Sequence, residues 1–134
     1  MEAYAAEHHV PIINENGRQV FLSVIRDLRP HRVLEIGTAI GYSALLLAAN
    51  GAADAHVTTL ELSEERAALA HGFIARSSYA DRIEILQGDA GELLTKLAGP
   101  YDFVFIDAAK GQYVRSCTLA STMGPGVKVV ASKF

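Results

Sequence analysis

The chain has 134 residues, of which 50% are hydrophobic and 20% are charged, and its formal net charge is −3 at pH 7. This length fits one domain built on a single sheet, and the hydrophobic content excludes a disordered chain. No apolar run is long enough to span a membrane, and the N-terminus lacks the pattern of a signal peptide. The single cysteine excludes an internal disulfide. It fits a reducing compartment, so we expect a cytoplasmic protein.

Helical and strand periodicities alternate along the chain. In chain order we expect a helix at 16–28, a strand at 33–36, a helix at 42–49, a strand at 56–60, a helix at 64–77, a strand at 83–87, a short helix at 90–97, a strand at 102–106, a helix at 111–122 and a strand at 127–131. Alternating strands and helices give right-handed crossovers. The prediction is therefore an α/β fold with a doubly wound, mostly parallel sheet. It forms a single domain over 1–134, with an N-terminal helical segment at about 1–30 and a sheet core at about 31–134.

The stretch RVLEIGTAIGYS at 32–43 predicts a buried strand, a tight glycine turn and the start of a helix. Such a turn lets the backbone approach a ligand, and Ser43 with the free N–H groups of the helix can hold a carboxylate. The glycines are spaced G-x-x-x-G, unlike the G-x-G-x-x-G of dinucleotide sites. Glu61 follows Gly41 by about 20 residues, at the end of the next strand, where a ribose-binding carboxylate is expected. The pattern predicts a nucleoside pocket.

Two further strand ends carry candidate site residues. Residues 88–90 end the third strand, and Asp89 can recognise an adenine edge or simply cap the following helix. Asp107, at the mouth of the fourth strand, is a candidate metal ligand or substrate anchor, and Lys110 is a candidate base. Plainer alternatives remain open. The glycines can merely shape a turn, Glu61 can be a solvated acid, and Asp107 with Lys110 can be a surface pair.

Taken together, RVLEIGTAIGYS and FIDAAKGQY at 105–113 resemble the class I S-adenosylmethionine-dependent O-methyltransferases of the caffeoyl-CoA and catechol type. The resemblance runs from about residue 2 to residue 131. The segment HHVPII at 8–13 and the run AAKGQY at 108–113 look most like bacterial members assigned as tRNA 5-hydroxyuridine methyltransferases. The resemblance implies a Rossmann-like methyltransferase fold. It also implies methyl transfer to a hydroxyl of an RNA base, in tRNA, or of a small phenolic acceptor.

The resemblance also implies roles for individual residues. In the family, the residues that match 37–43 hold the methionine part of S-adenosylmethionine, the match to Glu61 holds the ribose, and the match to Asp89 lies at the adenine. The match to Asp107 binds a divalent cation such as Mg²⁺, and the match to Lys110 is the general base in catechol-type members. The implied cofactor-binding set is Glu35, Gly37, Thr38, Ala39, Gly41, Tyr42, Ser43, Glu61, Leu62, Gly88, Asp89, Ala90 and Asp107.

The chain also departs from the family pattern. Family members continue for two more strands, so we expect this chain to lack the family's last two strands. An Asp-Asn pair supplies further metal ligands in the family, and Ser132 and Lys133 stand at those positions here, so we expect weak or absent metal binding. An open edge at 127–131 predicts a homodimer or a larger assembly. The alternatives are a truncated cofactor-binding module with little turnover and, disfavoured by the glycine spacing, a nucleotide-binding oxidoreductase domain.

Overall fold

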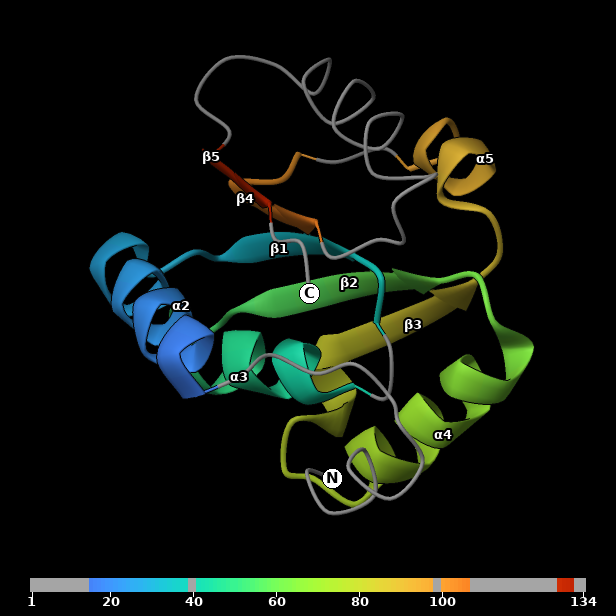
Figure 1. Cartoon of the computed structure of the whole chain (residues 1–134), viewed down its shortest axis with the longest axis horizontal. Coiled ribbons are helices and arrows are strands. Elements are labelled where there is room, and N and C mark those ends of the chain that lie inside the picture. Colours follow the sequence, from blue (N-terminus) through green and yellow to red (C-terminus); the bar gives the residue numbers. More distant parts are fainter. Residues whose placement is uncertain (1–14, 39–40, 98–99, 107–127, 132–134) are drawn as a thin grey trace.

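The computed structural model describes residues 15–38, 41–97, 100–106 and 128–131. These residues form one sheet with helices on both faces (Figure 1). In chain order the elements are α2 (Glu15–Leu28), β1 (Arg32–Ile36), α3 (Tyr42–Asn50), β2 (His56–Glu61), α4 (Glu64–Ala75), the 3₁₀ helix η1 (Ala80–Arg82), β3 (Ile83–Gln87), α5 (Ala90–Leu94), β4 (Phe103–Ile106) and β5 (Lys128–Ala131). The helix expected at 111–122 lies outside the described residues. Within the described part, no helix is both long and apolar enough to cross a membrane.

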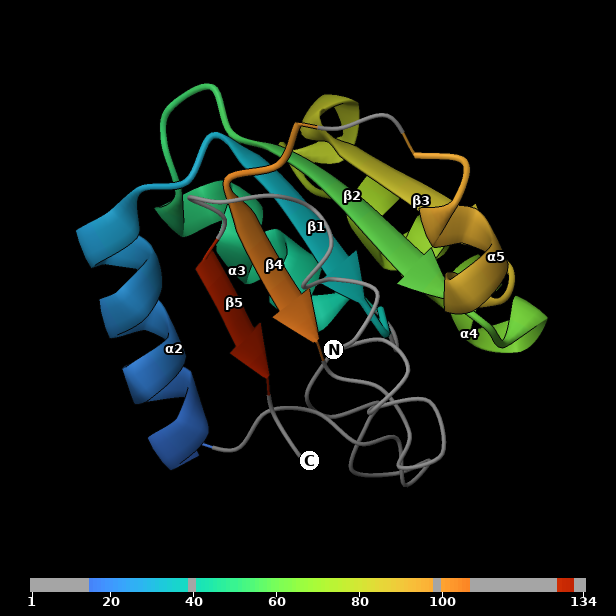
Figure 2. The ribbon, with the colours of Figure 1, turned by 90° about the horizontal axis from the view of Figure 1, so that it is seen from above.

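The five described strands lie in the order β3-β2-β1-β4-β5, and every adjacent pair is parallel (Figure 2). The chain builds outward from β1 to β3 and then crosses back to place β4 on the other side of β1. The direction of winding therefore reverses between β1 and β4. Open α/β sheets bind ligands at the carboxyl ends of their strands, near such a reversal. The predicted Rossmann-like, doubly wound architecture is confirmed.

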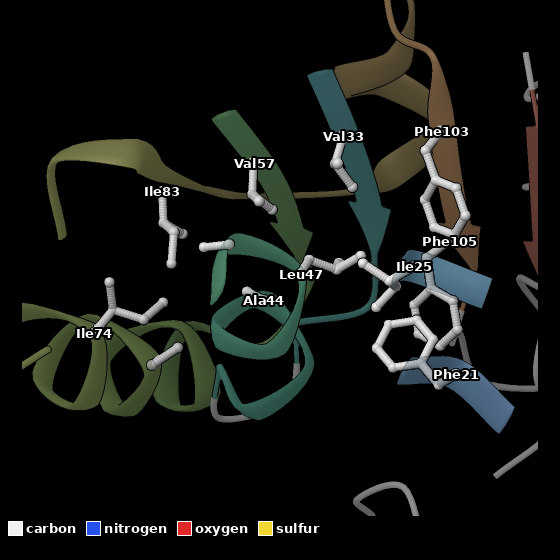
Figure 3. Close-up of a cluster of buried hydrophobic side chains, with 12 residues drawn as sticks. Phe21, Ile25, Val33, Ala44, Leu47, Val57, Ile74, Ile83, Phe103 and Phe105 are labelled. Carbon is white, nitrogen blue, oxygen red and sulfur yellow. The ribbon is translucent and has the colours of Figure 1, made fainter. Parts of the chain in front are cut away.

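One face of the sheet packs against α2, α3 and α4 (Figures 1 and 3). Successive strand side chains point to opposite faces, so alternate residues of each strand enter this layer. The rings of Phe21 on α2 and Phe105 on β4 lie with their centroids 4.5 Å apart, which packs the first described helix against β4, next to the central strand β1. The labelled members of this layer are Phe21, Ile25, Val33, Ala44, Leu47, Val57, Ile74, Ile83, Phe103 and Phe105.

The second face carries a smaller apolar layer under α5. Its buried members are Leu34, Ile36, Leu60, Ala90, Tyr101, Val104 and Ile106. Together the two layers bury β1 from both sides, which is why its sequence is an almost continuous apolar run. Glu35 interrupts that run and is nevertheless fully buried. Its position marks the place where the core becomes polar.

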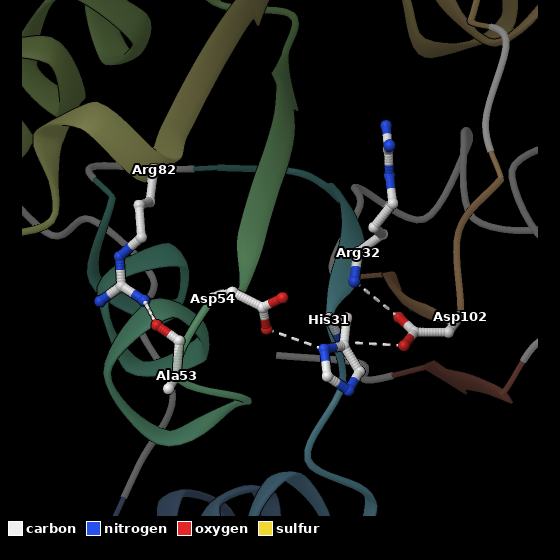
Figure 4. Close-up of polar contacts among 6 residues, drawn as sticks. All are labelled: His31, Arg32, Ala53, Asp54, Arg82 and Asp102. Carbon is white, nitrogen blue, oxygen red and sulfur yellow. Dashed lines mark hydrogen bonds and ion pairs between the residues drawn. The ribbon is translucent and has the colours of Figure 1, made fainter.

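Polar contacts fix the amino ends of the strands, at the opposite end of the sheet from the glycine turn (Figure 4). The Asp102 carboxylate accepts hydrogen bonds from the backbone N–H groups of His31 (2.8 Å) and Arg32 (2.9 Å). The His31 ring Nδ1 lies 2.8 Å from Asp54 Oδ1. Arg82 donates to a carbonyl oxygen in the loop before β2 at 2.7 Å. These contacts hold the starts of β1 and β4 together and leave the carboxyl ends for the site.

Two helices end earlier than their sequences predict, for the same reason. α4 ends two residues before 77, where the Ser77 hydroxyl donates to the Ile74 carbonyl oxygen at 2.7 Å. α5 ends three residues before 97, where the Thr95 hydroxyl donates to the Glu92 carbonyl oxygen at 2.7 Å. Hydroxyl side chains compete in this way with backbone N–H groups for carbonyls. The strands begin and end within one residue of their predicted bounds.

Candidate functional site

The carboxyl ends of β1, β2 and β3 meet at one edge of the sheet (Figure 2). The strands are in register there, with Ile36 paired to Leu60 and Glu61 paired to Gln87. The glycine turn follows β1, Glu61 ends β2, and residues 88–90 follow β3. β4 ends at the same edge, with Ile106 paired to Ile36, so the fold brings together all four predicted strand ends. The candidate residues of the first three are described, and Asp107 after β4 lies outside the described residues. Ala39, which was expected in the turn, lies outside the described residues.

Both glycines of the turn have backbone angles that side chains rarely adopt. Gly37 has φ 95° and Gly41 has φ 94°. The N–H groups of Gly37 and Thr38 both donate to the Leu60 carbonyl oxygen, at 2.8 and 3.1 Å, and the Gly41 N–H donates to the Thr38 carbonyl oxygen at 3.0 Å. A Cβ on Gly41 would lie 3.1 Å from the Ile74 side chain. The start of the turn is therefore hydrogen-bonded to β2, and Gly41 packs closely against α4.

A buried polar network lies beneath this turn. The fully buried Glu35 carboxylate accepts a hydrogen bond from the Thr59 hydroxyl at 2.6 Å and a second from the Ser43 hydroxyl. The Thr59 hydroxyl also contacts the Thr38 hydroxyl. Burying a carboxylate is costly unless hydrogen bonds replace its water, and these donors do so. The sequence interpretation missed Thr59, although strand alternation places it on the same sheet face as Glu35.

The start of α3 presents a helix N-terminus to the site. Within α3, all of which the structure describes, the first turn carries no acidic residue, and its N-cap Gly41 has no side chain to cap it. Uncapped N–H groups and the helix dipole favour an anion there. Ser43 has a single hydroxyl proton, which goes to Glu35. The expectation that this hydroxyl holds a ligand carboxylate stays a prediction. It requires Ser43 to give up its hydrogen bond to Glu35 and to donate to the ligand instead.

Glu61 is a buried carboxylate at the end of β2. Its side chain is 7% exposed, so the alternative of a solvated surface acid is wrong. One carboxylate oxygen accepts the backbone N–H of Ser63 at 2.9 Å, and the Glu61 carbonyl oxygen accepts the N–H of Gly88 at 2.9 Å. The next side chain, Leu62, is 50% exposed. The hydrogen-bonded Glu61 carboxylate and the exposed Leu62 side chain are therefore neighbours at the edge of the sheet.

Asp89 caps α5. Its carboxylate accepts the backbone N–H of Glu92 at 3.1 Å. The preceding Gly88 has φ 151°, and the following Ala90 is buried. The capping alternative is therefore confirmed, while recognition of an adenine edge by the same residue stays a prediction. The Gln87 side-chain amide donates to the Leu62 carbonyl oxygen at 2.8 Å, which ties the loops after β2 and β3 to each other.

The predicted metal ligands do not fall among the described residues. Among the described residues, no group of three or more His, Cys, Asp or Glu side chains is placed to hold a metal ion. The predicted ligand Asp107, the predicted base Lys110 and the substituted positions Ser132 and Lys133 all lie outside the described residues. Their roles stay predictions.

The parallel sheet, the left-handed glycine turn after β1 and the buried acid at the end of β2 define an α/β protein of the nucleotide-cofactor-binding class. The chain belongs to the O-methyltransferase family, whose family model matches residues 3–120.

Relatives of known name agree with this membership. A catechol O-methyltransferase of Niastella koreensis is 33% identical over 133 residues, which cover 94% of this chain and 60% of the relative. The O-methyltransferase of Bacillus cereus, solved in complex with SAH, superposes with a TM-score of 0.84 at 29% identity and covers 96% of this chain and 62% of its own. TomG of Streptomyces achromogenes, an O-methyltransferase of tomaymycin synthesis solved with SAM, superposes with a TM-score of 0.81 at 30% identity. The match covers 95% of this chain and 60% of TomG. The chain thus spans about three fifths of each.

Proposed function

We propose that the protein is an S-adenosylmethionine-dependent O-methyltransferase that acts on a hydroxyl of a catechol-type phenol. The observation that carries the proposal is the buried Glu61 carboxylate at the end of β2, beside the glycine turn of β1. Ribose presents two adjacent hydroxyl donors, and a carboxylate has two acceptor oxygens to meet them. Two solved relatives hold SAH or SAM in the same fold, which supports this cofactor.

The remaining cofactor contacts follow from the geometry of the strand ends. The uncapped start of α3 is suited to the cofactor's carboxylate, and the exposed Leu62 is suited to a face of the adenine. Asp89 and Ala90 are assigned to the adenine edge. The other predicted cofactor-binding residues are assigned to the same site: Glu35 and Thr38, which are buried beneath the turn, and Gly37, Ala39, Gly41, Tyr42, Ser43, Gly88 and Asp107.

When bound, S-adenosylmethionine supplies a methyl group on a positively charged sulfur. The chain's own residues hold the cofactor and the acceptor oxygen in line, and Lys110 takes the proton from the acceptor hydroxyl. In the best cases, such positioning lowers a barrier by about 7–11 kcal/mol. Asp107 is assigned as a ligand of a divalent cation such as Mg²⁺. Because Ser132 and Lys133 add no carboxylate, we expect a titration to detect only weak Mg²⁺ binding. Tight binding without substrate would mean that the ligands are misassigned.

The acceptor is assigned on the catechol O-methyltransferase of Niastella koreensis, which aligns with nearly the whole chain. The resemblance to tRNA 5-hydroxyuridine methyltransferases makes an RNA hydroxyl the alternative acceptor. The homodimer and the cytoplasmic location expected from the sequence stay predictions.

Incubation with methyl-labelled S-adenosylmethionine and separate pools of catechol and tRNA tests this function. We expect label in the catechol pool and its loss in Lys110→Met, with SAH affinity unchanged in that variant. Label in tRNA alone would show that the acceptor is an RNA hydroxyl and not a catechol-type phenol. SAH binding without transfer to either pool would favour a cofactor-binding module with little turnover.

A further inference from the structure

We propose that Thr59 is a positioning residue of the cofactor site. Its side chain is fully buried, as are those of its partners Glu35 and Thr38, so it acts on the cofactor only through the glycine turn that these residues support. Through them it holds the glycine turn in the shape that the cofactor needs. The inference rests on the proposed function, and it adds a residue that neither the sequence motif nor the family membership singles out.

Thr59 lies between the acid of β1 and the glycine turn. Thr59 lies on β2 directly opposite Glu35 on β1, as register partners of a parallel pair. Both side chains point to the face covered by α3, and the Thr59 hydroxyl lies 2.6 Å from Glu35 Oε1. The same hydroxyl contacts the hydroxyl of Thr38, which is itself buried at the start of the turn. One side chain therefore touches both the acid of β1 and the turn that follows β1.

The hydrogen bonds through Thr59 have a definite direction. An ionised carboxylate can only accept, and each threonine hydroxyl has one proton. The Thr59 proton goes to Glu35, so the contact between the two threonines must be donated by Thr38. The order Thr38 to Thr59 to Glu35 is thus fixed. Thr59 has to accept and donate at once, which serine can do and valine cannot.

The network around Thr59 extends to both sides of the glycine turn. Ser43, in the first turn of α3, donates to the other oxygen of Glu35. Thr38 lies at the start of the turn, directly after Gly37, and its carbonyl oxygen accepts the N–H of Gly41 at the other end. The network therefore joins the two sides of the glycine turn through Thr59 and Glu35. Loss of the Thr59 hydroxyl would loosen both sides, and binding would then have to order the turn.

Calorimetry with SAH tests the inference on three variants of the whole chain. We expect Thr59→Val to weaken binding about tenfold, since a hydrogen bond to a buried charge is lost. Thr59→Ser should restore the affinity to within about threefold of wild type, because it keeps the donor and the acceptor. The control is Thr58→Val, a buried neighbour on the opposite face of β2, which should leave the affinity within about twofold.

Hydrogen exchange adds a readout that separates the turn from the sheet. In Thr59→Val the N–H groups of Thr38 and Gly41 should exchange faster, while that of Leu34 in β1 should not change. Wild-type affinity in a folded Thr59→Val overturns the inference, as does a variant too unstable to fold, since Thr59 would then stabilise the whole sheet. A wild-type chain that does not bind SAH contradicts the proposed function itself.

Discussion

At the residue scale, Gly41 and Gly72 differ in whether their positions require a glycine. Gly41 lies in the left-handed region, and a Cβ there would come within 3.1 Å of Ile74. Gly72 lies inside α4, where a Cβ would meet only the end of the flexible Arg76 side chain, at 3.5 Å. Only the first position needs glycine.

We therefore expect Gly41→Ala to lower the free energy of unfolding by about 1–2 kcal/mol, because alanine is strained at this φ and crowds α4. Gly72→Ala should raise it by about 0.5–1 kcal/mol, since alanine is the better helix former. Urea denaturation measures both. A Gly41→Ala variant as stable as the wild type would contradict the left-handed conformation of Gly41.

A second residue-scale prediction concerns the amino ends of the strands. The hydrogen bond from His31, followed by a backbone hydrogen bond, lowers the pKa of Asp54 from its ordinary value of 3.8. A lowered folded-state pKa stabilises the protein above the ordinary value, and this contribution is lost as pH falls through the folded-state pKa. We expect Asp54→Asn to be less stable than the wild type at pH 6, with the gap closing below about pH 4. Acid titration of the denaturation midpoint measures this, with the exposed Asp81→Asn as the control. A gap that is independent of pH would contradict the contact.

At the element scale, the strands could be predicted closely and the helix ends could not. Strand bounds follow from short apolar runs bordered by turn residues, which are local in sequence. The ends of α4 and α5 depend on whether Ser77 and Thr95 turn their hydroxyls back onto carbonyls. The contact of Thr59 with Glu35 depends on the register of two strands that lie 24 residues apart in the chain. Strand periodicity gives the face on which each residue lies, but it does not give this register.

Asp89 carries two assignments that can be separated on its element. A serine at this position can still cap α5 but removes the carboxylate. We expect Asp89→Ser to keep the free energy of unfolding within about 0.5 kcal/mol, whereas Asp89→Ala should lose about 1 kcal/mol. If Asp89 also contacts the adenine, both variants should bind SAH more weakly, by calorimetry. Wild-type affinity in Asp89→Ser would leave capping as its role.

At the scale of the whole molecule, the strand order decides what meets at the site. The reversal between β1 and β4 leaves the turn, Glu61 and Asp89 on the β1-β2-β3 side (Figure 2). The alternation of elements predicts that these residues share one edge, because parallel strands end at the same edge, but it does not give the strand order. The proposed catalytic residues, Asp107 and Lys110, follow β4 in the sequence. The described strand ends therefore supply the cofactor-binding residues, and the family resemblance supplies the roles of Asp107 and Lys110.

We propose that the carboxyl edge of β1, β2 and β3 binds S-adenosylmethionine through Glu61. Calorimetry with SAH on wild type, Glu61→Gln and Glu64→Gln tests it most directly, since Glu64 is an exposed acid three residues further along. We expect Glu64→Gln to match the wild type and Glu61→Gln to lose about 1.5–3 kcal/mol, or roughly 10- to 150-fold in affinity. Equal binding by all three proteins would remove Glu61 from the site, and a wild type that does not bind SAH would contradict the claim as a whole.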